Sequence, residues 1–333
     1  MMAIIPNNQL RFAYFGTPEF ASIILEELFV KGFAPSLIVT QPDKPRGRKL
    51  VLTPSEVKAW GEAHGAHVLT PMKMRDEDFL SVLRAANCEL FIVAAYGKIL
   101  PKEVLDMPKY GVLNVHPSLL PKFRGSSPIE SAILSDEKWT GVTIIELDEE
   151  MDHGPVIAQR ERIIPHWPPR GSELTRDLAH FGGSLLADVI PEWLNGLKAY
   201  PQDHARATFT KKISKEGGLL QLDANLARYC KSPAIGGNTK VWTDEVSEKA
   251  YDSMSSRPAE GTPSSAPSDE LLYKKIRAYD EWPGTYFFVQ KNGKETRVKV
   301  TDAKLEEGKL VITKVIPEGK KEMAYEDFLR GSH

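Results

Sequence analysis

Short apolar runs alternate with helix signals along the first half of the chain, and this alternation constrains the fold more than any other feature. Runs of strand length lie at residues 11–16, 36–40, 67–70 and 89–95. Between them, Thr53-Pro54-Ser55-Glu56 is a capping box that opens a helix. Strands that alternate with helices at this spacing form a parallel sheet with helices on both faces. The first half is therefore predicted to be doubly wound α/β.

The first domain is predicted to extend beyond these strands. Two more apolar runs, 111–115 and 142–147, bracket a helix near 128–134. Apolar residues at helical spacing from 172 to about 197 predict a long helix that closes the domain. After the first strand, Thr17-Pro18 has the order of a capping hydroxyl and a first-turn proline, so Thr17 is expected to cap the following helix.

A different pattern follows the polar, proline-containing stretch 200–206, which is predicted to be a linker. The elements expected after it are a helix over 269–279 capped by Ser268, strands over 286–290, 296–300 and 310–315, and a hairpin turn at Asn292-Gly293. These elements predict a small antiparallel β domain. The stretch 253–268 is rich in serine and proline and is not expected to pack.

Charge and cysteine usage exclude several classes of protein. The formal net charge of −2 and a pI near 6.5 argue against a chain-wide basic surface for nucleic acids, while a local basic patch stays open. Cys88 and Cys230 are far apart and outside any C-x-x-C spacing, which argues against a zinc site and suits a reducing compartment. No stretch approaches the ~18 uninterrupted apolar residues of a membrane span. We expect a cytoplasmic protein with no bound metal and no membrane contact.

The strongest catalytic candidates lie at the end of a predicted strand. In Asn114-Val115-His116, alternation places Asn114 and His116 on one face, at the sheet edge where ligands of α/β proteins bind. An amide donor beside an imidazole suits a developing oxyanion. The carboxylate that an imidazolium needs is sought in the acidic stretch 148–154, with Asp152 as the choice. A satisfied structural histidine is the alternative, which the sequence leaves open.

Two loops at the same edge are distinctive. Residues 41–50 carry Lys44, Arg46, Arg48 and Lys49 in a proline- and glycine-rich loop that either contacts the phosphates of an anionic partner or is simply solvated. Residues 116–121 hold two prolines around a dileucine, so they form either a rigid pocket wall or an ordinary crossover. The glycine patterns of dinucleotide and Walker-type phosphate sites do not occur, which argues against both.

Taken together, these segments resemble the folate-dependent formyltransferases. The N-x-H-x-S-L-L-P element at 114–121 is similar to one shared by that family, and F-G-T-P at 15–18 and Q-P-D-K-P at 41–45 resemble the branch that acts on methionyl-tRNA. The resemblance covers about 11–215 and resumes at 271–330. It implies a Rossmann-like formyltransferase domain followed by an OB-like barrel. It also implies formyl transfer from 10-formyltetrahydrofolate to the amino group of initiator methionyl-tRNA through a stabilised tetrahedral intermediate, in support of translation initiation.

The resemblance also implies roles for individual residues. Asn114, His116 and Asp152 fall on the catalytic positions. The residues that fall on the folate-binding segments are Tyr96, Gly97, Ile99, Ser118, Leu119, Leu120 and Pro121. Lys44, Arg46, Arg48 and Lys49 fall on the loop that engages the tRNA acceptor stem. A monomer is expected, although the sequence carries no signal of its own for the oligomeric state.

Domain boundaries follow from the resemblance. We expect a catalytic domain over 1–199, a linker over 200–210, and a tRNA-binding domain over 211–333 with a flexible insertion around 224–267. Two features depart from the family pattern: the basic loop reads G-R-K-L, one residue shorter than usual, and the barrel is expected to be short. Two alternatives remain: a relative that formylates a sugar nucleotide or hydrolyses the formyl donor, and a non-catalytic RNA-binding protein.

Overall fold

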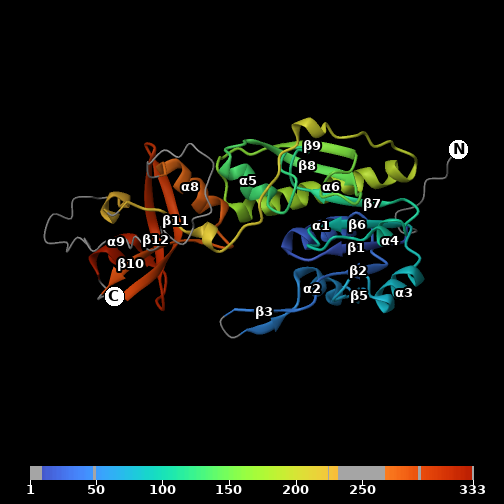
Figure 1. The fold of residues 1–333 in the computed structure, drawn as a ribbon, viewed down its shortest axis with the longest axis horizontal. Helices are drawn as coiled ribbons and strands as arrows, with labels where there is room; N and C mark the ends of the chain where they lie inside the picture. The colour runs from blue at the N-terminus through green and yellow to red at the C-terminus, as the bar shows by residue number, and fades with distance from the viewer. Residues whose placement is uncertain (1–9, 48–49, 224, 232–266, 292–293, 332–333) are drawn as a thin grey trace. The chain divides into compact units, whose positions relative to one another are not determined.

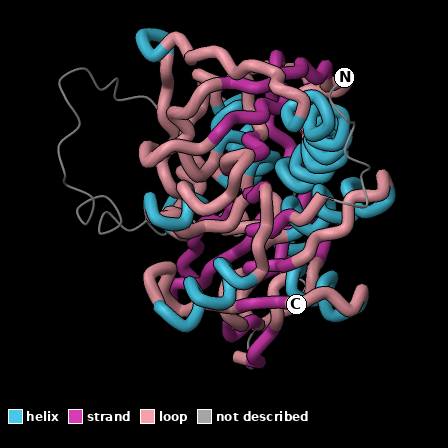
Figure 2. Tube along the Cα trace, turned by 90° about the vertical axis from the view of Figure 1, so that its right-hand side faces the viewer, coloured by secondary structure: helices cyan, strands magenta, loops and turns pink. Residues whose placement is uncertain are grey.

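The computed structural model describes residues 10–47, 50–223, 225–231, 267–291 and 294–331. Contacts divide the described residues into two compact units. The first unit lies within Met1–Ala132, Glu137–Trp167 and Glu173–Lys212, and the second within Ile133–Asp136, Pro168–Ser172 and Ile213–His333. Figure 2 marks the helices, strands and loops along the trace by colour. Most of the expected insertion, 224 and 232–266, lies outside the described residues.

The first unit is built on a seven-stranded sheet with the order β5-β2-β1-β6-β7-β8-β9 (Figure 1). Its strands are β1 (Phe12–Gly16), β2 (Leu37–Val39), β5 (Val68–Leu69), β6 (Leu90–Ala94), β7 (Val112–His116), β8 (Trp139–Glu146) and β9 (Val156–Ile163). The pairs from β5 to β7 are parallel, and β7–β8 and β8–β9 are antiparallel. The prediction of a mostly parallel α/β sheet is confirmed.

Helices cover both faces of this sheet. The helices are α1 (Glu19–Val30), α2 (Glu56–Ala63), α3 (Glu77–Ala85), α4 (Lys102–Leu105), α5 (Pro128–Leu134) and α6 (Gly171–Leu194), with a short 3-10 turn, η2, at His204–Arg206. On one face, Phe79 of α3 and Val104 of α4 share a buried cluster with Phe15 of β1. On the other face, the Tyr14 hydroxyl donates to a carbonyl of α1. Successive strand residues thus point to opposite helical layers.

The second unit contains an antiparallel four-stranded sheet with the order β10-β11-β12-β13. Its strands are β10 (Thr285–Lys291), β11 (Lys294–Glu306), β12 (Lys309–Pro317) and β13 (Met323–Ala324), and its helices are α8 (Asp269–Ala278), α9 (Tyr325–Arg330), η3 (Glu216–Gly218) and η4 (Leu226–Tyr229). The Ser268 hydroxyl caps α8 as predicted. Tyr229 and Cys230 are buried in the core of this unit, so the first residues of the expected insertion belong to its folded part.

Three local expectations were wrong. Residues 41–50 are not a plain loop, because β3 (Lys44–Arg46) pairs with β4 (Val51–Thr53) in an antiparallel hairpin. The strand β9 was missed, because its outer residues are exposed and lack an apolar run. Pro18 rather than Thr17 occupies the N-cap of α1, and the Thr17 hydroxyl instead donates to the Tyr96 carbonyl at 3.0 Å.

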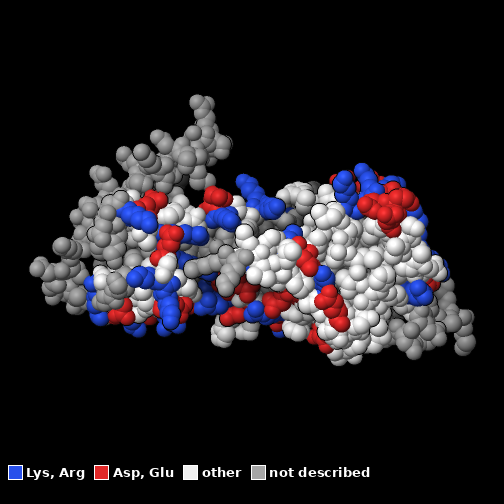
Figure 3. All heavy atoms as spheres, turned by 90° about the horizontal axis from the view of Figure 1, so that it is seen from below, with Lys and Arg blue, Asp and Glu red and all other residues white. Residues whose placement is uncertain are grey.

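Charges of both signs are interspersed on the face seen in Figure 3, in line with the small net charge. Among the described helices, none is both long and apolar enough to cross a bilayer.

Candidate active site

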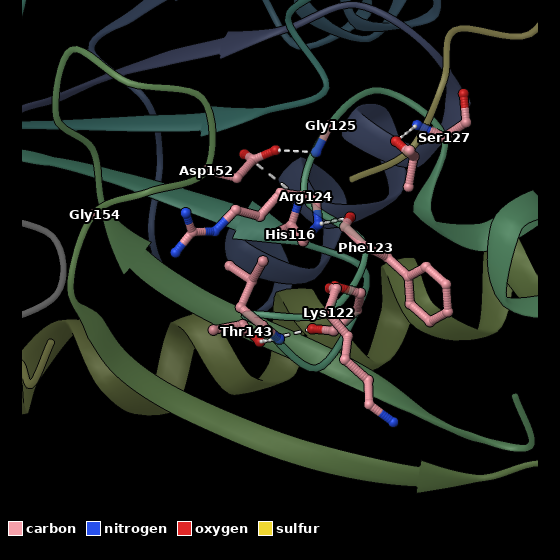
Figure 4. A network of polar contacts seen from close by, with 12 residues as sticks. His116, Lys122, Phe123, Arg124, Gly125, Ser127, Thr143, Asp152 and Gly154 are labelled. Carbon is pink, nitrogen blue, oxygen red and sulfur yellow. Dashed lines mark hydrogen bonds and ion pairs between the residues drawn. The ribbon is translucent and has the colours of Figure 1, made fainter. Parts of the chain in front are cut away.

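His116 and Asp152 face each other at the carboxyl end of β7 (Figure 4). The His116 Nδ1 atom lies 3.6 Å from Asp152 Oδ1, and both side chains are largely buried. The other carboxylate oxygen, Oδ2, accepts a hydrogen bond from the Gly125 amide at 2.7 Å. A distance of 3.6 Å exceeds a direct hydrogen bond, so the two side chains interact through their charge rather than through a hydrogen bond when His116 is protonated.

The partner of the other imidazole nitrogen fixes the proton on His116. Nε2 lies 3.0 Å from the Phe123 carbonyl oxygen. Because a carbonyl only accepts, Nε2 carries the hydrogen and donates it. Nδ1 is the nitrogen that faces Asp152, and a second proton placed on it would turn the ring into an imidazolium that faces a carboxylate. This arrangement lets His116 hold or deliver a proton at Nδ1.

Asn114 shares the face of β7 with His116. Val115, between them, points the other way, because a Cβ placed on Gly182 of α6 would lie 2.9 Å from its Cγ1 atom. Asn114 is only 8% exposed, yet its side-chain amide makes no hydrogen bond to any described residue. Fully enclosed side-chain polar atoms without a partner are represented among the described residues by Thr301 Oγ1 alone, so the unpaired amide of Asn114 is not fully enclosed. The amide thus reaches the surface beside His116, where it can bind a ligand atom.

The loop that follows β7 is held rigidly by a buried hydroxyl. Thr143 Oγ1 of β8 donates to the Ser118 carbonyl at 2.7 Å and accepts from the Leu120 amide at 3.1 Å. The Gln159 side chain of β9 donates both to Thr143 Oγ1 and to the Leu120 carbonyl. Leu120 is buried, and the Leu120–Pro121 peptide bond is cis. Among the two interpretations of this loop, the contacts favour a rigid wall.

The remaining residues of that wall are only partly fixed by side-chain contacts. Ser118 is buried, and its hydroxyl donates to the Lys122 carbonyl at 2.6 Å. Leu119 and Pro121 are half-buried. Leu119 packs close to Gly141 of β8, where a Cβ would approach its Cδ2 atom to 2.7 Å.

In the Tyr96 segment the side chain faces the core and the backbone carbonyl accepts hydrogen bonds from other loops. The Tyr96 side chain is buried in the core, where burial raises the pKa of its hydroxyl, and this hydroxyl donates to Met74 Sδ. Its carbonyl accepts from Gln41 Nε2 at 2.8 Å as well as from Thr17. Gly97 has φ +78°, and a Cβ there would lie 2.5 Å from Gln41 Nε2. Ile99 is 82% exposed. The chain therefore brings together backbone groups and one exposed apolar side chain.

The basic candidates lie on the β3–β4 hairpin. Lys44 Nζ donates to the Gln41 side chain. Arg46 forms a two-pronged ion pair with Glu56 of α2, which lowers the pKa of the Glu56 carboxyl. Arg48 and Lys49 lie outside the described residues. The sequence analysis did not predict that one of these cations, Arg46, forms an ion pair with Glu56.

The predicted linker instead packs against the site loop. The Thr208 carbonyl accepts from the Arg124 amide at 2.8 Å, and the Thr208 hydroxyl accepts from the Phe123 amide. Gln202 is buried and hydrogen-bonded to Arg124 and to the turn that holds Asp152. Neither residue was identified from the sequence, because long-range pairing of this kind leaves no periodic signal.

No group of three or more His, Cys, Asp or Glu side chains suited to a metal ion occurs within the described ranges.

Comparison with known proteins decides the family. A formyl transferase family model matches residues 10–190, more than half of the chain. The methionyl-tRNA formyltransferase of Thermus thermophilus is 35% identical over 345 aligned residues, which cover 97% of this chain and 96% of the relative. This chain belongs to the methionyl-tRNA formyltransferase family. The formyltransferase of the same name from Chloroflexus aggregans is 44% identical over 280 residues, covering 84% of this chain and 76% of the relative.

A solved structure shares the fold of this formyltransferase. HypX from Aquifex aeolicus, in complex with tetrahydrofolic acid, superposes with a TM-score of 0.58 at 17% identity. The match covers 97% of this chain and 48% of HypX. This likeness concerns the fold, whereas the family model and the relatives at 35% and 44% identity confirm the family indicated by the sequence motifs.

Proposed function

We propose that this formyltransferase moves the formyl group of 10-formyltetrahydrofolate to the amino group of initiator methionyl-tRNA. The observation that carries the proposal is the meeting of Asn114, His116 and Asp152 at the carboxyl end of β7 in a chain of this family. The reaction forms a bond between the attacking amine and the formyl carbon, and breaks the bond between that carbon and N10 of the folate. One proton passes from the amine to N10.

Asn114 and His116 have the chemistry to stabilise the tetrahedral intermediate. Negative charge develops on the formyl oxygen as the amine attacks, and preorganised donors at that oxygen lower the barrier. The Asn114 amide has no partner among the described residues, so it is free to donate. His116 Nε2 is committed to the Phe123 carbonyl, so a second proton, carried by the imidazolium form on Nδ1, is the one that can be donated to the oxyanion or passed on.

Asp152 supports this role of His116. Its Oδ1 faces Nδ1, and the Gly125 amide holds its Oδ2, so the carboxylate stabilises an imidazolium or orients a relaying water. A carboxylate at this position also favours proton return to His116 after transfer.

The folate is proposed to bind along two segments. The Tyr96 and Gly97 backbone and exposed Ile99 form one side. The rigid loop with Ser118, Leu119, Leu120 and Pro121 forms the other. Glycine at position 97 keeps this backbone in place, because a side chain there would meet Gln41, whose amide donates to the Tyr96 carbonyl.

The tRNA is proposed to meet the basic hairpin, through Lys44, Arg46, Arg48 and Lys49. Replacing Arg46, Arg48 and Lys49 by alanine should raise the KM for tRNA and flatten its dependence on salt, since each phosphate contact releases counterions. An unchanged salt slope would exclude the hairpin from tRNA binding.

The direct test supplies 10-formyltetrahydrofolate with four parallel acceptors: methionyl-initiator tRNA, uncharged tRNA, an amino-sugar nucleotide and buffer alone. Formylation confined to the charged tRNA is expected. Product on the sugar nucleotide, or folate consumed in buffer, would move the protein to a sister activity. Tight tRNA binding without folate binding would indicate a non-catalytic RNA-binding protein.

A substitution links the activity to the site. His116→Ala is expected to lower kcat by about 10²–10⁴-fold, because a positioned proton donor contributes that much. The exposed His67 provides the matched control, and His67→Ala should keep wild-type turnover. Wild-type turnover of His116→Ala, with melting unchanged, would remove His116 from the mechanism.

A further inference from the structure

Asp152 has a left-handed backbone conformation. Its φ is +49°, in a region that is uncommon for residues other than glycine, although Asp enters it more readily than most. A residue persists there only where its surroundings fix it. The carboxylate that faces His116 is therefore set on a turn that needs external support.

That support comes from Gln202. Its Nε2 atom donates to the Asp152 carbonyl at 2.9 Å and to the Gly154 carbonyl at 2.8 Å, so one amide spans the turn. Gln202 is 6% exposed. On its other side the turn packs tightly against β8, because a Cβ on Gly154 would overlap the Glu146 carbonyl oxygen. The position of the Asp152 carboxylate thus depends on an amide donor far away in sequence.

Arg124 decides which way the Gln202 amide points. Its Nε and Nη2 atoms lie 3.1 and 2.7 Å from Gln202 Oε1. A guanidinium only donates, so it requires the oxygen of Gln202 on its side. The NH₂ group is thereby turned toward the two carbonyls. His204 Nδ1, 2.8 Å from Nη2, must likewise accept.

The charge of Arg124 is not used in an ion pair within the described ranges. Arg124 is only 3% exposed, and its guanidinium contacts Gln202, His204 Nδ1 and, at 6.0 Å from the ring centre, Phe209. Burying a cation in this way is costly unless hydrogen bonds compensate. Its neighbours along the chain, Phe123 and Gly125, contact His116 and Asp152 directly. Arg124 thus stands in the chain between the two residues whose backbones contact the catalytic pair (Figure 4).

We propose that Gln202, oriented by Arg124, is a positioning residue that holds Asp152 toward His116 during formyl transfer. This inference rests on the proposed function for its catalytic consequence, whereas its geometric part is independent of it. Gln202→Glu tests it most sharply. The variant keeps the shape and the acceptor for Arg124, but it loses both donated hydrogen bonds to the turn.

Gln159→Glu is the matched control. Gln159 also donates two hydrogen bonds to buried acceptors, Leu120 O and Thr143 Oγ1, but it does not touch Asp152. Both variants thus lose two amide donors in the same unit. Thermal melting of each shows whether general destabilisation explains an effect.

The kinetic test is a double-mutant cycle with Asp152→Ala. Gln202→Glu is expected to lower kcat by about 10–100-fold, since small misplacements of catalytic groups cost that much, with KM for both substrates nearly unchanged. In the Asp152→Ala background the same substitution should cost less than about twofold, because residues that act as a unit are not additive. Gln159→Glu should cost the same factor in both backgrounds. A full additional loss from Gln202→Glu on top of Asp152→Ala would overturn the proposal.

A second readout needs no activity. The Gly125 amide proton donates to Asp152, so its hydrogen exchange reports the position of the carboxylate. Exchange should be faster in Gln202→Glu and unchanged in Gln159→Glu, and equal rates in Gln202→Glu and wild type would overturn the proposal. If wild type fails to formylate methionyl-tRNA, the proposed function fails, while the exchange rates still decide whether Gln202 positions Asp152.

Discussion

The Thr143 hydroxyl offers a quantitative test of how the site loop is held. It is fully buried, donates to the Ser118 carbonyl, and accepts from the Leu120 amide and from the Gln159 side chain. Thr143→Val keeps the shape of the side chain but leaves the two backbone groups without that partner, whereas the Gln159 amide keeps its other acceptor, the Leu120 carbonyl. At about 1–3 kcal/mol for each unsatisfied buried group, we expect a loss near 3 kcal/mol. In a unit of about 200 residues, this corresponds to a fall of about 6–12 °C in Tm.

The second unit provides the same substitution with the opposite expected sign. Thr301 Oγ1 is enclosed and has no hydrogen-bond partner among the described residues. Thr301→Val removes a buried polar atom that gains nothing, so it should raise the stability of its unit by about 1 kcal/mol.

Differential scanning calorimetry of the full chain measures both variants. The reasoning predicts a lowered transition for Thr143→Val and an equal or raised one for Thr301→Val. A Thr143→Val protein that melts within about 2 °C of wild type would show that these hydrogen bonds contribute little. Equal losses in the two variants would show that valine itself, rather than hydrogen bonding, causes the change.

Two further predictions concern the hairpin and the folate segment. Arg46 lowers the pKa of Glu56, so the pair stabilises the folded state above the unfolded pKa of Glu56, and this contribution is lost as pH falls through the lower folded value. Arg46→Ala should therefore raise the pKa of Glu56 in an NMR titration. Glu56→Gln should free Arg46 for the tRNA and lower the KM for tRNA. A lowered pKa of Glu56 in the first variant or a raised KM in the second would contradict this. Gly97→Ala should destabilise by more than the ~1–2 kcal/mol expected from a left-handed φ alone and should raise the KM for folate, because the new methyl group would meet Gln41. Gly47 is the control, because its φ of +71° is similar and a Cβ there would have nothing within 4 Å, so Gly47→Ala measures the backbone cost alone. Equal losses of unfolding free energy for the two variants in urea denaturation would refute the steric contribution at Gly97.

Local patterns predicted most of the fold because they depend on near neighbours. Apolar runs of strand length mark β1, β6 and β7, since strands buried on both faces need apolar residues throughout. The edge strand β9 failed this rule because most of its side chains are exposed. The rule also misses the hairpin β3–β4, because its residues are mostly exposed and form no buried apolar run. Only their pairing in the folded chain identifies them as strands.

The sequence also located part of the candidate site. Alternation along β7 assigns Asn114 and His116 to one face at a strand end, and the motif supplied the family. Asp152 was chosen from an acidic stretch on weak grounds, because spacing along the chain does not measure distance in space.

Sequence alone determined the α/β class, the antiparallel C-terminal sheet, the family and the strand that carries Asn114 and His116, because each follows from periodicity or from a contiguous motif. Only the tertiary structure decided that His116 Nε2 donates to Phe123, that Asp152 lies 3.6 Å from Nδ1, and that Gln202, in the segment expected to form a linker, donates to the turn that carries Asp152. The physical reason is that buried polar groups must find partners wherever the folded chain brings donors and acceptors together. Gln202 lies 50 residues beyond Asp152, and folding alone brings them into contact.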